Sequence, residues 1–251
     1  MPQRLAPWCY VSARSCFLSS PTCASRESIY AVAMAKPQLI IANKNYSSWS
    51  LRPYMALAAF EIPFAEKLIR FGEPQFGKAV RRYSKAGLVP ILKHNDLVIW
   101  DSLAIIEYLN ETWPNKQMWP KNKAARAMAR SISAEMHSGF KALRNACPMN
   151  LRRPPKSVAM NEAILNDVAR LESIIAECRK AHSKGGAFLF GRFSLADAIY
   201  APLLTRLETY AIKVKPITKA YIKAVLETAA FQSWKTAALK EKWIVPEDEV
   251  D

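Results

Sequence analysis

The 251-residue chain has no run that approaches about 18 consecutive apolar residues, the shortest stretch that indicates a membrane-spanning helix. The sequence therefore predicts no membrane span. Acidic residues are scarce: 21 oppose 36 basic ones, which gives a formal net charge of +15. Such a surplus can indicate nucleic acid, a membrane surface or anionic small molecules as partners. Because the basic residues are scattered, and no RNA-binding signature, zinc-finger spacing or basic zipper accompanies them, nucleic-acid binding is not predicted.

Cysteine is also scarce in the body of the chain. Three of the five cysteines, Cys9, Cys16 and Cys23, lie in the first 36 residues. Only Cys147 and Cys178 follow, with no CxxC motif and no Cys/His cluster, which argues against structural disulfides and zinc. The sequence thus predicts a reducing compartment, no metal, and a Cys178 side chain that simply packs in an apolar helical stripe.

Residues 1–36 differ from the rest of the chain. They are rich in Arg, Ser and Ala, contain the single acid Glu27, and show no helical or strand period. Such a leader is typical of an organelle transit peptide, and it lacks the apolar core of a secretory signal. The alternative is a reading frame opened too far upstream, because Met34 stands just before the first strand. We expect this segment to be disordered. The expected location is the cytoplasm, or a mitochondrion or another organelle if residues 1–33 are a transit peptide.

The stretch NKNYSSWSLRPYMAL, residues 43–57, follows a short apolar strand and leads into a helical pattern. Pro53 fits the first turn of a helix, where its missing N–H group costs nothing. Ser47, Ser48 and Ser50 therefore stand at the junction between a strand and a helix N-terminus. Unpaired N–H groups and the helix dipole favour an anion at such a place, although a serine there can also simply cap the helix.

Residues 37–112 are expected to form a small mixed sheet with helices on its faces. A second strand is predicted at residues 64–71, and a hairpin at residues 88–92 and 97–100 with its turn at residues 94–96. The order of elements is βαβ followed by ββα.

Two local signals stand out in this region. Pro90 interrupts an apolar strand and cannot donate to a sheet ladder, so an edge position or a cis bond between Val89 and Pro90 would account for it. Asp101 or Ser102 is placed to cap the helix that follows the hairpin.

Residues 113–122 hold two prolines and no period, which indicates a linker, and every segment of residues 123–251 is predicted to be helical. One long amphipathic helix is expected over residues 125–143, and Ser157 is expected to cap the next one. Two weaker helical patterns lie at residues 217–226 and 231–239.

Between them, Ser194 and Asp197 have the spacing of a capping box that precedes an apolar helix. We expect this pair to be structural.

From about Gln38 to Trp243 the chain resembles the cytosolic glutathione transferases. Four pieces carry the resemblance: the serine motif YSSWSLRPYMAL, close to that of zeta-like and related bacterial members, the pair Val89-Pro90, the pair Asp101-Ser102, and the capping box Phe193-Ser-Leu-Ala-Asp197. The resemblance implies an α/β plus all-α fold, with an N-terminal thioredoxin-like domain followed by an all-helical C-terminal domain.

The resemblance also implies that glutathione is the co-substrate and that its thiol is ionised for attack on a small electrophile. Lowering a thiol pKa of about 8.5 by two units requires about 2.7 kcal/mol, and one hydrogen bond to a charged group supplies about 1.5–3 kcal/mol. By motif position Ser47 is the expected donor, with Ser48 as the close alternative and Ser50 as the third. Trp49 replaces the cysteine of the zeta-like motif, which argues against zeta-type isomerase activity and glutathione-disulfide chemistry.

Other positions are implied to hold glutathione. The backbone of Val89, next to Pro90, would pair with the cysteinyl amide. Ser102 would take the γ-glutamyl carboxylate, with Asp101 near the amine. Gln75 stands in a polar loop where zeta-like members place a glutamine.

Arg52 lies close to this site, or is a solvated helix residue. The second substrate would bind between the domains, against the helical stripe from Met128 to Phe140. The resemblance also implies a homodimer, because members of this family dimerise. The alternatives are a glutathione-dependent isomerase, a peroxidase, and a non-catalytic transferase-fold protein that binds apolar ligands or partners.

Overall fold

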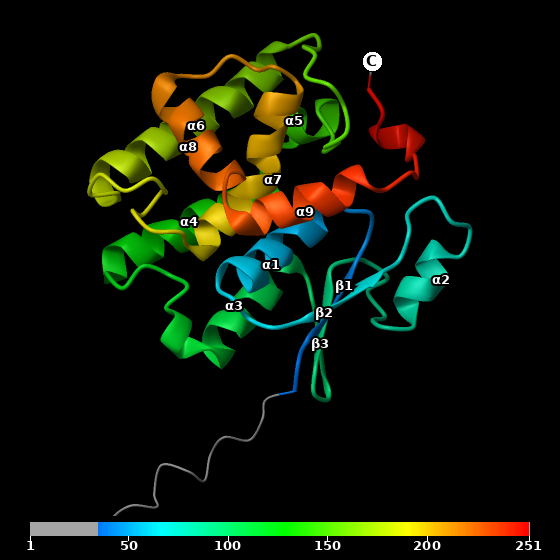
Figure 1. Ribbon diagram of the computed structural model, residues 1–251. Helices are drawn as coiled ribbons and strands as arrows, with labels where there is room; N and C mark the ends of the chain where they lie inside the picture. The colour runs from blue at the N-terminus through cyan, green and yellow to red at the C-terminus, as the bar shows by residue number, and fades with distance from the viewer. Residues whose placement is uncertain (1–34, 251) are drawn as a thin grey trace, which may run out of the picture. The chain divides into compact units, whose positions relative to one another are not determined.

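A four-stranded mixed sheet begins the part of the chain that the computed structural model describes, residues 35–250 (Figure 1). Its strands are β1 (Gln38–Ile41), β2 (Ala65–Leu68), β3 (Ile91–His94) and β4 (Leu97–Trp100). Their order is β2-β1-β3-β4, with β1 parallel to β2 and antiparallel to β3, which pairs antiparallel with β4. The predicted mixed sheet is confirmed. All but the last two residues of the predicted leader lie outside the described residues.

Helices cover both faces of this sheet. They are α1 (Ser48–Ala59), α2 (Phe76–Arg81) and α3 (Ser102–Thr112). Successive residues of a strand point to opposite faces. Leu39 and Ile41 of β1 accordingly join the main core with α1 and α3, whereas Ile40 joins a smaller cluster with Val80 of α2.

The peptide bond between Val89 and Pro90 is cis, which was one of the two alternatives that the sequence left open, and β3 begins only at Ile91. His94 is the last residue of β3, so the predicted turn at residues 94–96 is one residue too long. The second strand is also shorter than the predicted 64–71. Strand ends depend on the neighbouring strand, which local sequence does not reveal.

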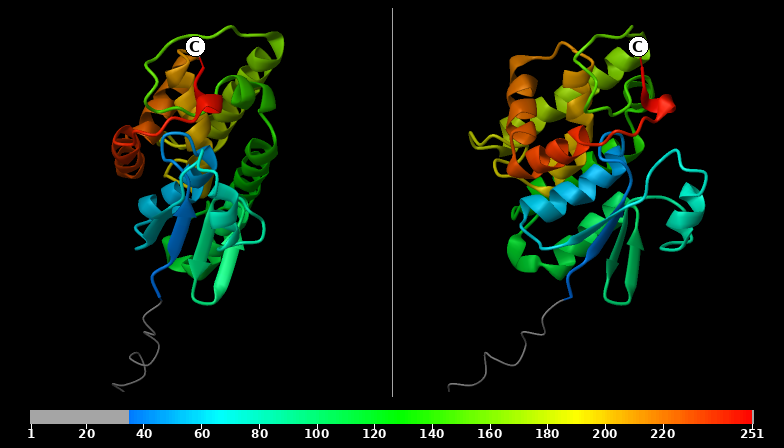
Figure 2. Two further views of the ribbon diagram at one scale, coloured as in Figure 1. Left: turned by 90° about the vertical axis from the view of Figure 1, so that its right-hand side faces the viewer. Right: turned by 45° about the vertical axis from the view of Figure 1, so that its right-hand side comes forward.

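The rest of the chain is helical. It consists of η1 (Pro114–Lys116), α4 (Lys123–Ser138), α5 (Lys141–Ala146), α6 (Glu162–His182), α7 (Leu195–Thr209), α8 (Pro216–Leu226), α9 (Ala229–Leu239) and η2 (Pro246–Asp248). Helix α7 is buried almost throughout, and α1 packs directly on α7 and α9 (Figures 1 and 2). The predicted fold class is therefore confirmed, and one continuous apolar core joins the α/β part to the helical part.

Two predicted helix boundaries are wrong. The long helix expected over residues 125–143 is divided into α4 and α5, because the chain turns at Gly139 and Phe140 has a left-handed φ of 56°. The apolar period continues across the break, since Phe140 and Leu143 are both buried, so the pattern did not reveal it. The cap of α6 is Asn161, whose Oδ1 accepts from the N–H of Ile164 at 2.9 Å, and not Ser157.

The predicted capping box at the start of α7 is confirmed. Asp197 is fully buried, and its Oδ2 accepts from the N–H and the hydroxyl of Ser194, both at 2.8 Å. Its Oδ1 accepts from Leu189 N–H at 3.2 Å and from the Tyr221 hydroxyl at 2.9 Å. Burial raises the pKa of Asp197, while these four bonds stabilise its charged form. One carboxylate thus joins the loop before α7 to α8.

The remaining sequence expectations concern Cys178, membrane-spanning helices and metal sites. Cys178 is buried in α6 and unpaired, as predicted. Within residues 35–250, no helix is long and apolar enough to cross a membrane. The same residues contain no group of three or more His, Cys, Asp or Glu that could hold a metal ion.

We expect Asp197→Ala to lower the free energy of unfolding by about 3–5 kcal/mol, because it leaves several buried donors without an acceptor. Urea denaturation measures the loss. Asp96→Ala is the matched control, since Asp96 is exposed in the hairpin turn and should change stability by about 0.5 kcal/mol or less. A similar loss in both variants would contradict the role given to Asp197.

Candidate functional site

A cavity of about 430 Å³ lies at the N-terminal ends of α1 and α3. Its wall consists of Trp49, Ala86, Leu88, Val89, Pro90, Trp100, Asp101 and Ser102. Four of the predicted site residues, Val89, Pro90, Asp101 and Ser102, are therefore brought together by the fold. The wall is mostly apolar, with a carboxylate and a hydroxyl at one end.

Val89 is part of this wall. It precedes β3, and neither its N–H nor its C=O takes part in a hydrogen bond among the described residues. A backbone donor and acceptor that face a cavity can pair with an extended peptide in the manner of an added strand.

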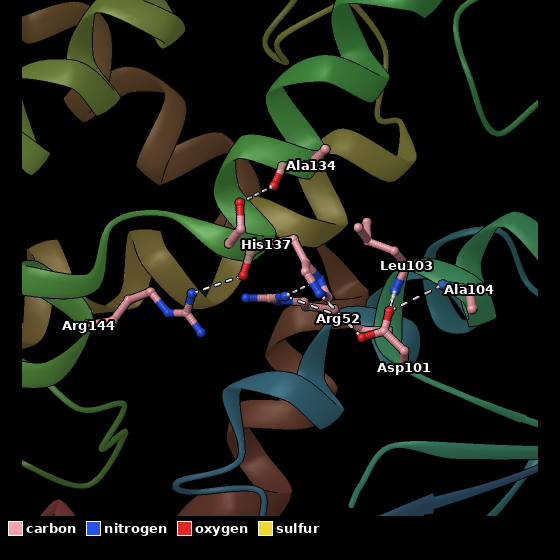
Figure 3. Close-up of polar contacts among 9 residues, drawn as sticks. Arg52, Asp101, Leu103, Ala104, Ala134, His137 and Arg144 are labelled. Atoms are coloured by element: carbon pink, nitrogen blue, oxygen red, sulfur yellow. Dashed lines mark hydrogen bonds and ion pairs between the residues drawn. The ribbon is translucent and has the colours of Figure 1, made fainter. Parts of the chain in front are cut away.

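Asp101 is the N-cap that precedes α3, and its φ is positive, at 71°. Its Oδ1 accepts from the N–H groups of Leu103 and Ala104, at 2.8 and 3.4 Å, and so caps the helix. Of the two predicted caps, Asp101 is therefore the one observed. Its Oδ2 lies 3.3 Å from Nε2 of His137, a residue of α4 (Figure 3).

Ser102 is fully buried, and its Oγ accepts a hydrogen bond from Nη1 of Arg52 at 3.3 Å. The hydroxyl hydrogen of Ser102 has no acceptor among residues 35–250. Because Ser102 also lines the cavity, that hydrogen and the N–H of Ser102 are left for an anion there, whereas the N–H groups of Leu103 and Ala104 already donate to Asp101. The arrangement can hold a carboxylate.

Arg52 is 1% exposed, so the interpretation of Arg52 as a solvated helix residue is wrong. Its Nη1 also lies 3.4 Å from Nδ1 of His137, and its Nε has no partner within the part of the chain that the structure describes. Burial lowers the pKa of Arg52 to about 9, and the positive charges of Arg144 and Arg206 contribute to the shift while Asp101 opposes it. Arg52 therefore keeps its proton at neutral pH.

Trp49 covers this charged group from the cavity side. The guanidinium carbons of Arg52 and Arg144 lie 4.1 and 4.9 Å from a Trp49 ring centroid, and the imidazole of His137 packs edge-on at 5.0 Å. Arg144 is held in place by the carbonyls of His137 and Gly139, each at 3.1 Å. An indole ring stabilises such cations through its π face.

His137 and Arg144 were not found from the sequence. They belong to the helical part and approach the site only through tertiary packing, so no local motif marks them. Their one signal is the position of His137 near the end of the helix that was expected to face the second substrate.

The three serines of the motif behave differently from one another. Ser47 is the N-cap of α1, and its hydroxyl donates to Ser50 Oγ at 2.8 Å. Ser50 is fully buried and also accepts from the N–H of Ala42 at 3.2 Å. The hydroxyl of Ser48 makes no hydrogen bond among residues 35–250. Neither Ser47 nor Ser48 belongs to the cavity wall, although Trp49 beside them does.

The loop that precedes Ser47 is fixed by the C-terminal region. Glu241 accepts from the N–H groups of Lys44 and Asn45, at 2.8 and 3.1 Å. The Tyr46 hydroxyl donates to Glu249, which also accepts from Asn150. The acidic tip, left outside the resemblance in the sequence, thus contributes to placing the serine motif.

Two other sequence expectations concern residues away from this wall. Gln75 is exposed, precedes α2 and is not part of the cavity wall. The stripe from Met128 to Phe140 is interrupted by the end of α4, and Met136 within it is fully buried in the core.

Residues 46–112 match the family described as "Glutathione S-transferase, N-terminal domain". The chain is 30% identical over 202 residues to maleylacetoacetate isomerase of Rattus norvegicus, which covers 78% of this chain and 91% of that protein. It is 26% identical over 213 residues to glutathione S-transferase Z1 of Arabidopsis thaliana, with 79% and 92% covered.

The fold is also similar to solved structures. One is a glutathione transferase homolog from Burkholderia gl BGR1 with bound glutathione, at a TM-score of 0.63 and 22% identity, covering 82% of this chain and all of that chain. At this identity the likeness concerns the fold.

Glu241→Ala should lower the free energy of unfolding by about 2–4 kcal/mol, because two backbone N–H groups before α1 lose their acceptor and Glu241 is only 9% exposed. Thermal and urea unfolding measure the change. Glu247→Ala, at an exposed position of the same C-terminal segment, serves as the control and should leave stability unchanged within about 0.5 kcal/mol. Equal unfolding midpoints for wild type and Glu241→Ala would show that the loop does not depend on this carboxylate.

Proposed function

The chain belongs to the glutathione transferase family and is zeta-like within it, and on that premise we propose that it conjugates glutathione to small electrophiles. The observation that carries the proposal is the cavity wall. It presents an unpaired peptide group at Val89 and an unpaired hydroxyl hydrogen at Ser102. These are the groups that a short peptide with a carboxylate at one end requires.

Glutathione would lie along this wall. Its cysteinyl amide would pair with the backbone of Val89, and its γ-glutamyl carboxylate would accept from Ser102. The free amine would face Asp101, whose carboxylate is on the same side. Arg52 supports the proposal, because a buried guanidinium without a directly bonded carboxylate favours an anion nearby.

The chemical step requires the thiolate of glutathione. The sulfur forms a bond to the electrophilic carbon, and the leaving group departs with its electron pair. We propose that Ser47 donates its hydroxyl hydrogen to that sulfur. Ser47 must first give up its bond to Ser50. The exchange replaces a neutral hydrogen bond of about 0.5–1.5 kcal/mol with a charge-assisted one of about 1.5–3 kcal/mol, so it remains favourable.

Ser48 is the alternative donor. The Ser48 hydroxyl makes no hydrogen bond among residues 35–250 and therefore has none to give up. Ser47, in contrast, stands at the position that the serine motif assigns to the donor. Ser47 is also the N-cap of α1, where the helix dipole stabilises an anion by about 0.3–1 kcal/mol.

Glutathione-dependent isomerisation is the second candidate, because several relatives carry the name maleylacetoacetate isomerase. Trp49 stands where the zeta-like motif has its cysteine, and it argues against this reaction. A panel of electrophiles and cis-enone dicarboxylates separates the two activities.

We further propose a homodimer in the cytoplasm. The support for the dimer is that the chain belongs to this family, from which a homodimer is expected. Cys147 and Cys178 are both unpaired, which fits a reducing compartment. Sedimentation equilibrium of the full chain tests the dimer.

We expect Ser47→Ala to raise the pKa of bound glutathione by about 1–2 units, because the thiolate loses one charge-assisted hydrogen bond. Titration of the ultraviolet thiolate band in the complex measures the pKa, and the rate of conjugation to a chlorinated nitrobenzene should fall in parallel.

Ser131→Ala, at an exposed position of α4, is the control. If Ser48→Ala raises the pKa and Ser47→Ala does not, the role passes to Ser48. A bound thiol that stays protonated in the wild type would favour the non-catalytic binding protein instead.

A further inference from the structure

His137 joins the helical part of the chain to the carboxylate end of the cavity. Its Nε2 lies 3.3 Å from Oδ2 of Asp101, and its Nδ1 lies 3.4 Å from Nη1 of Arg52 (Figure 3). The two partners come from different elements, the cap of α3 and the helix α1. One imidazole ring on α4 therefore contacts both charged residues next to Ser102.

The partners determine the protonation of the ring. A guanidinium has only donors, so Nδ1 of His137 must be the acceptor and carries no hydrogen. Nε2 then carries the hydrogen of the neutral ring and donates it to Asp101. The pKa of His137 is consistent with this state, because burial lowers it, and Arg52 and Arg144 add to the shift against the opposing charge of Asp101.

The orientation of Arg52 depends on this acceptor. Nη1 has two hydrogens, and its two bonds go to Ser102 Oγ and His137 Nδ1. The Nε group has no partner among residues 35–250, so it does not fix the plane of the guanidinium. Because Arg52 donates to Ser102 Oγ, the hydroxyl hydrogen of Ser102 is left for another acceptor, and Ser102 is part of the cavity wall.

We propose that His137, as the neutral Nε2–H tautomer, is a positioning residue for the carboxylate end of the glutathione site. It keeps Arg52 hydrogen-bonded to Ser102, and it keeps Asp101 in place at the cap of α3. It thereby directs the Ser102 hydroxyl toward the γ-glutamyl carboxylate. The inference rests on the proposed function, and it adds a residue of the helical part to the site.

The groups that face His137 are Asp101, Arg52, Arg144 and the ring of Trp49. Protonation would put a hydrogen on Nδ1, remove the acceptor of Arg52, and place two positive charges 3.4 Å apart. The stability of this arrangement is present above the ordinary histidine pKa of about 6.5 and is lost as the pH falls through the lowered pKa of the folded state. Binding should follow the same direction.

The test uses the full-length protein and S-methylglutathione, which has no thiol to ionise. Calorimetric titration at pH 7 compares the wild type with two variants. His137→Phe keeps an aromatic ring against Trp49 but has neither donor nor acceptor, and it should weaken binding about tenfold, the effect of losing one charged hydrogen bond. His137→Gln keeps one donor and one acceptor, and should bind within about twofold to threefold of the wild type.

His182→Phe is the matched control. His182 ends α6, stacks on Phe190, and is not part of the cavity wall. Its replacement should leave the affinity unchanged, and thermal unfolding identifies any variant that loses affinity because it does not fold.

Two further measurements respond to positioning and not to packing alone. Long-range ¹⁵N–¹H correlation spectra should show His137 protonated at Nε2 and unprotonated at Nδ1 at pH 7. The affinity of the wild type for S-methylglutathione should fall as the pH is lowered from 7 to 5, and His137→Gln, which does not titrate, should lose much of this dependence.

The outcomes separate the two proposals. A folded His137→Phe variant with unchanged affinity, or a His137 ring protonated at Nδ1, overturns the positioning role while glutathione binding stands. An affinity that rises as the pH falls would mean that His137 acts as a positive charge, and also overturns it. A wild type that does not bind S-methylglutathione rejects the proposed function and this inference together.

Discussion

The burial of Arg52 is the constraint on which the rest of the site depends. Removing a guanidinium from water costs several kcal/mol unless other groups replace its hydration. No carboxylate of residues 35–250 forms an ion pair with it, and the compensation comes from Ser102, His137 and the ring of Trp49. These residues belong to three helices, so the charge forces α1, the start of α3 and the end of α4 to meet at one point. The cavity lies beside that point because its wall includes Trp49 and Ser102.

The start of α1 also depends on contacts with the C-terminal region. The loop before Ser47 is largely buried, so its backbone groups need partners. Glu241, just after α9, accepts from the N–H groups of Lys44 and Asn45, and Glu249 in the tail accepts from the Tyr46 hydroxyl. The position of the serine hydroxyls is thus determined by residues about 200 positions later in the chain. A small α/β unit taken alone would lack this support, so the geometry of the serine motif depends on the helical part.

The accuracy of sequence-based inference follows from the range of the interactions. The capping box of Ser194 and Asp197 was predictable because it depends on neighbouring residues. For the cis bond before Pro90 and the cap at Asp101, the local sequence left two alternatives each, and the observed one was among them. The break at Gly139 was not predictable, since buried side chains continue the helical period on either side of it. The partners of Arg52 were missed for a similar reason. The sequence alone does not distinguish a solvated arginine from a buried one, because the difference arises only from tertiary packing.

Trp49 connects these constraints to the chemistry. A cysteine at this place would offer a thiol of its own to the cavity, whereas an indole offers only a surface. That surface lies against Arg52, Arg144 and His137 and separates them from the cavity. The cations therefore act on a bound anion through Ser102 and through the field of buried charge, which a low dielectric strengthens. No thiol belongs to the cavity wall among the described residues, so the proposed reaction depends on the sulfur of the co-substrate, which the protein would hold and ionise.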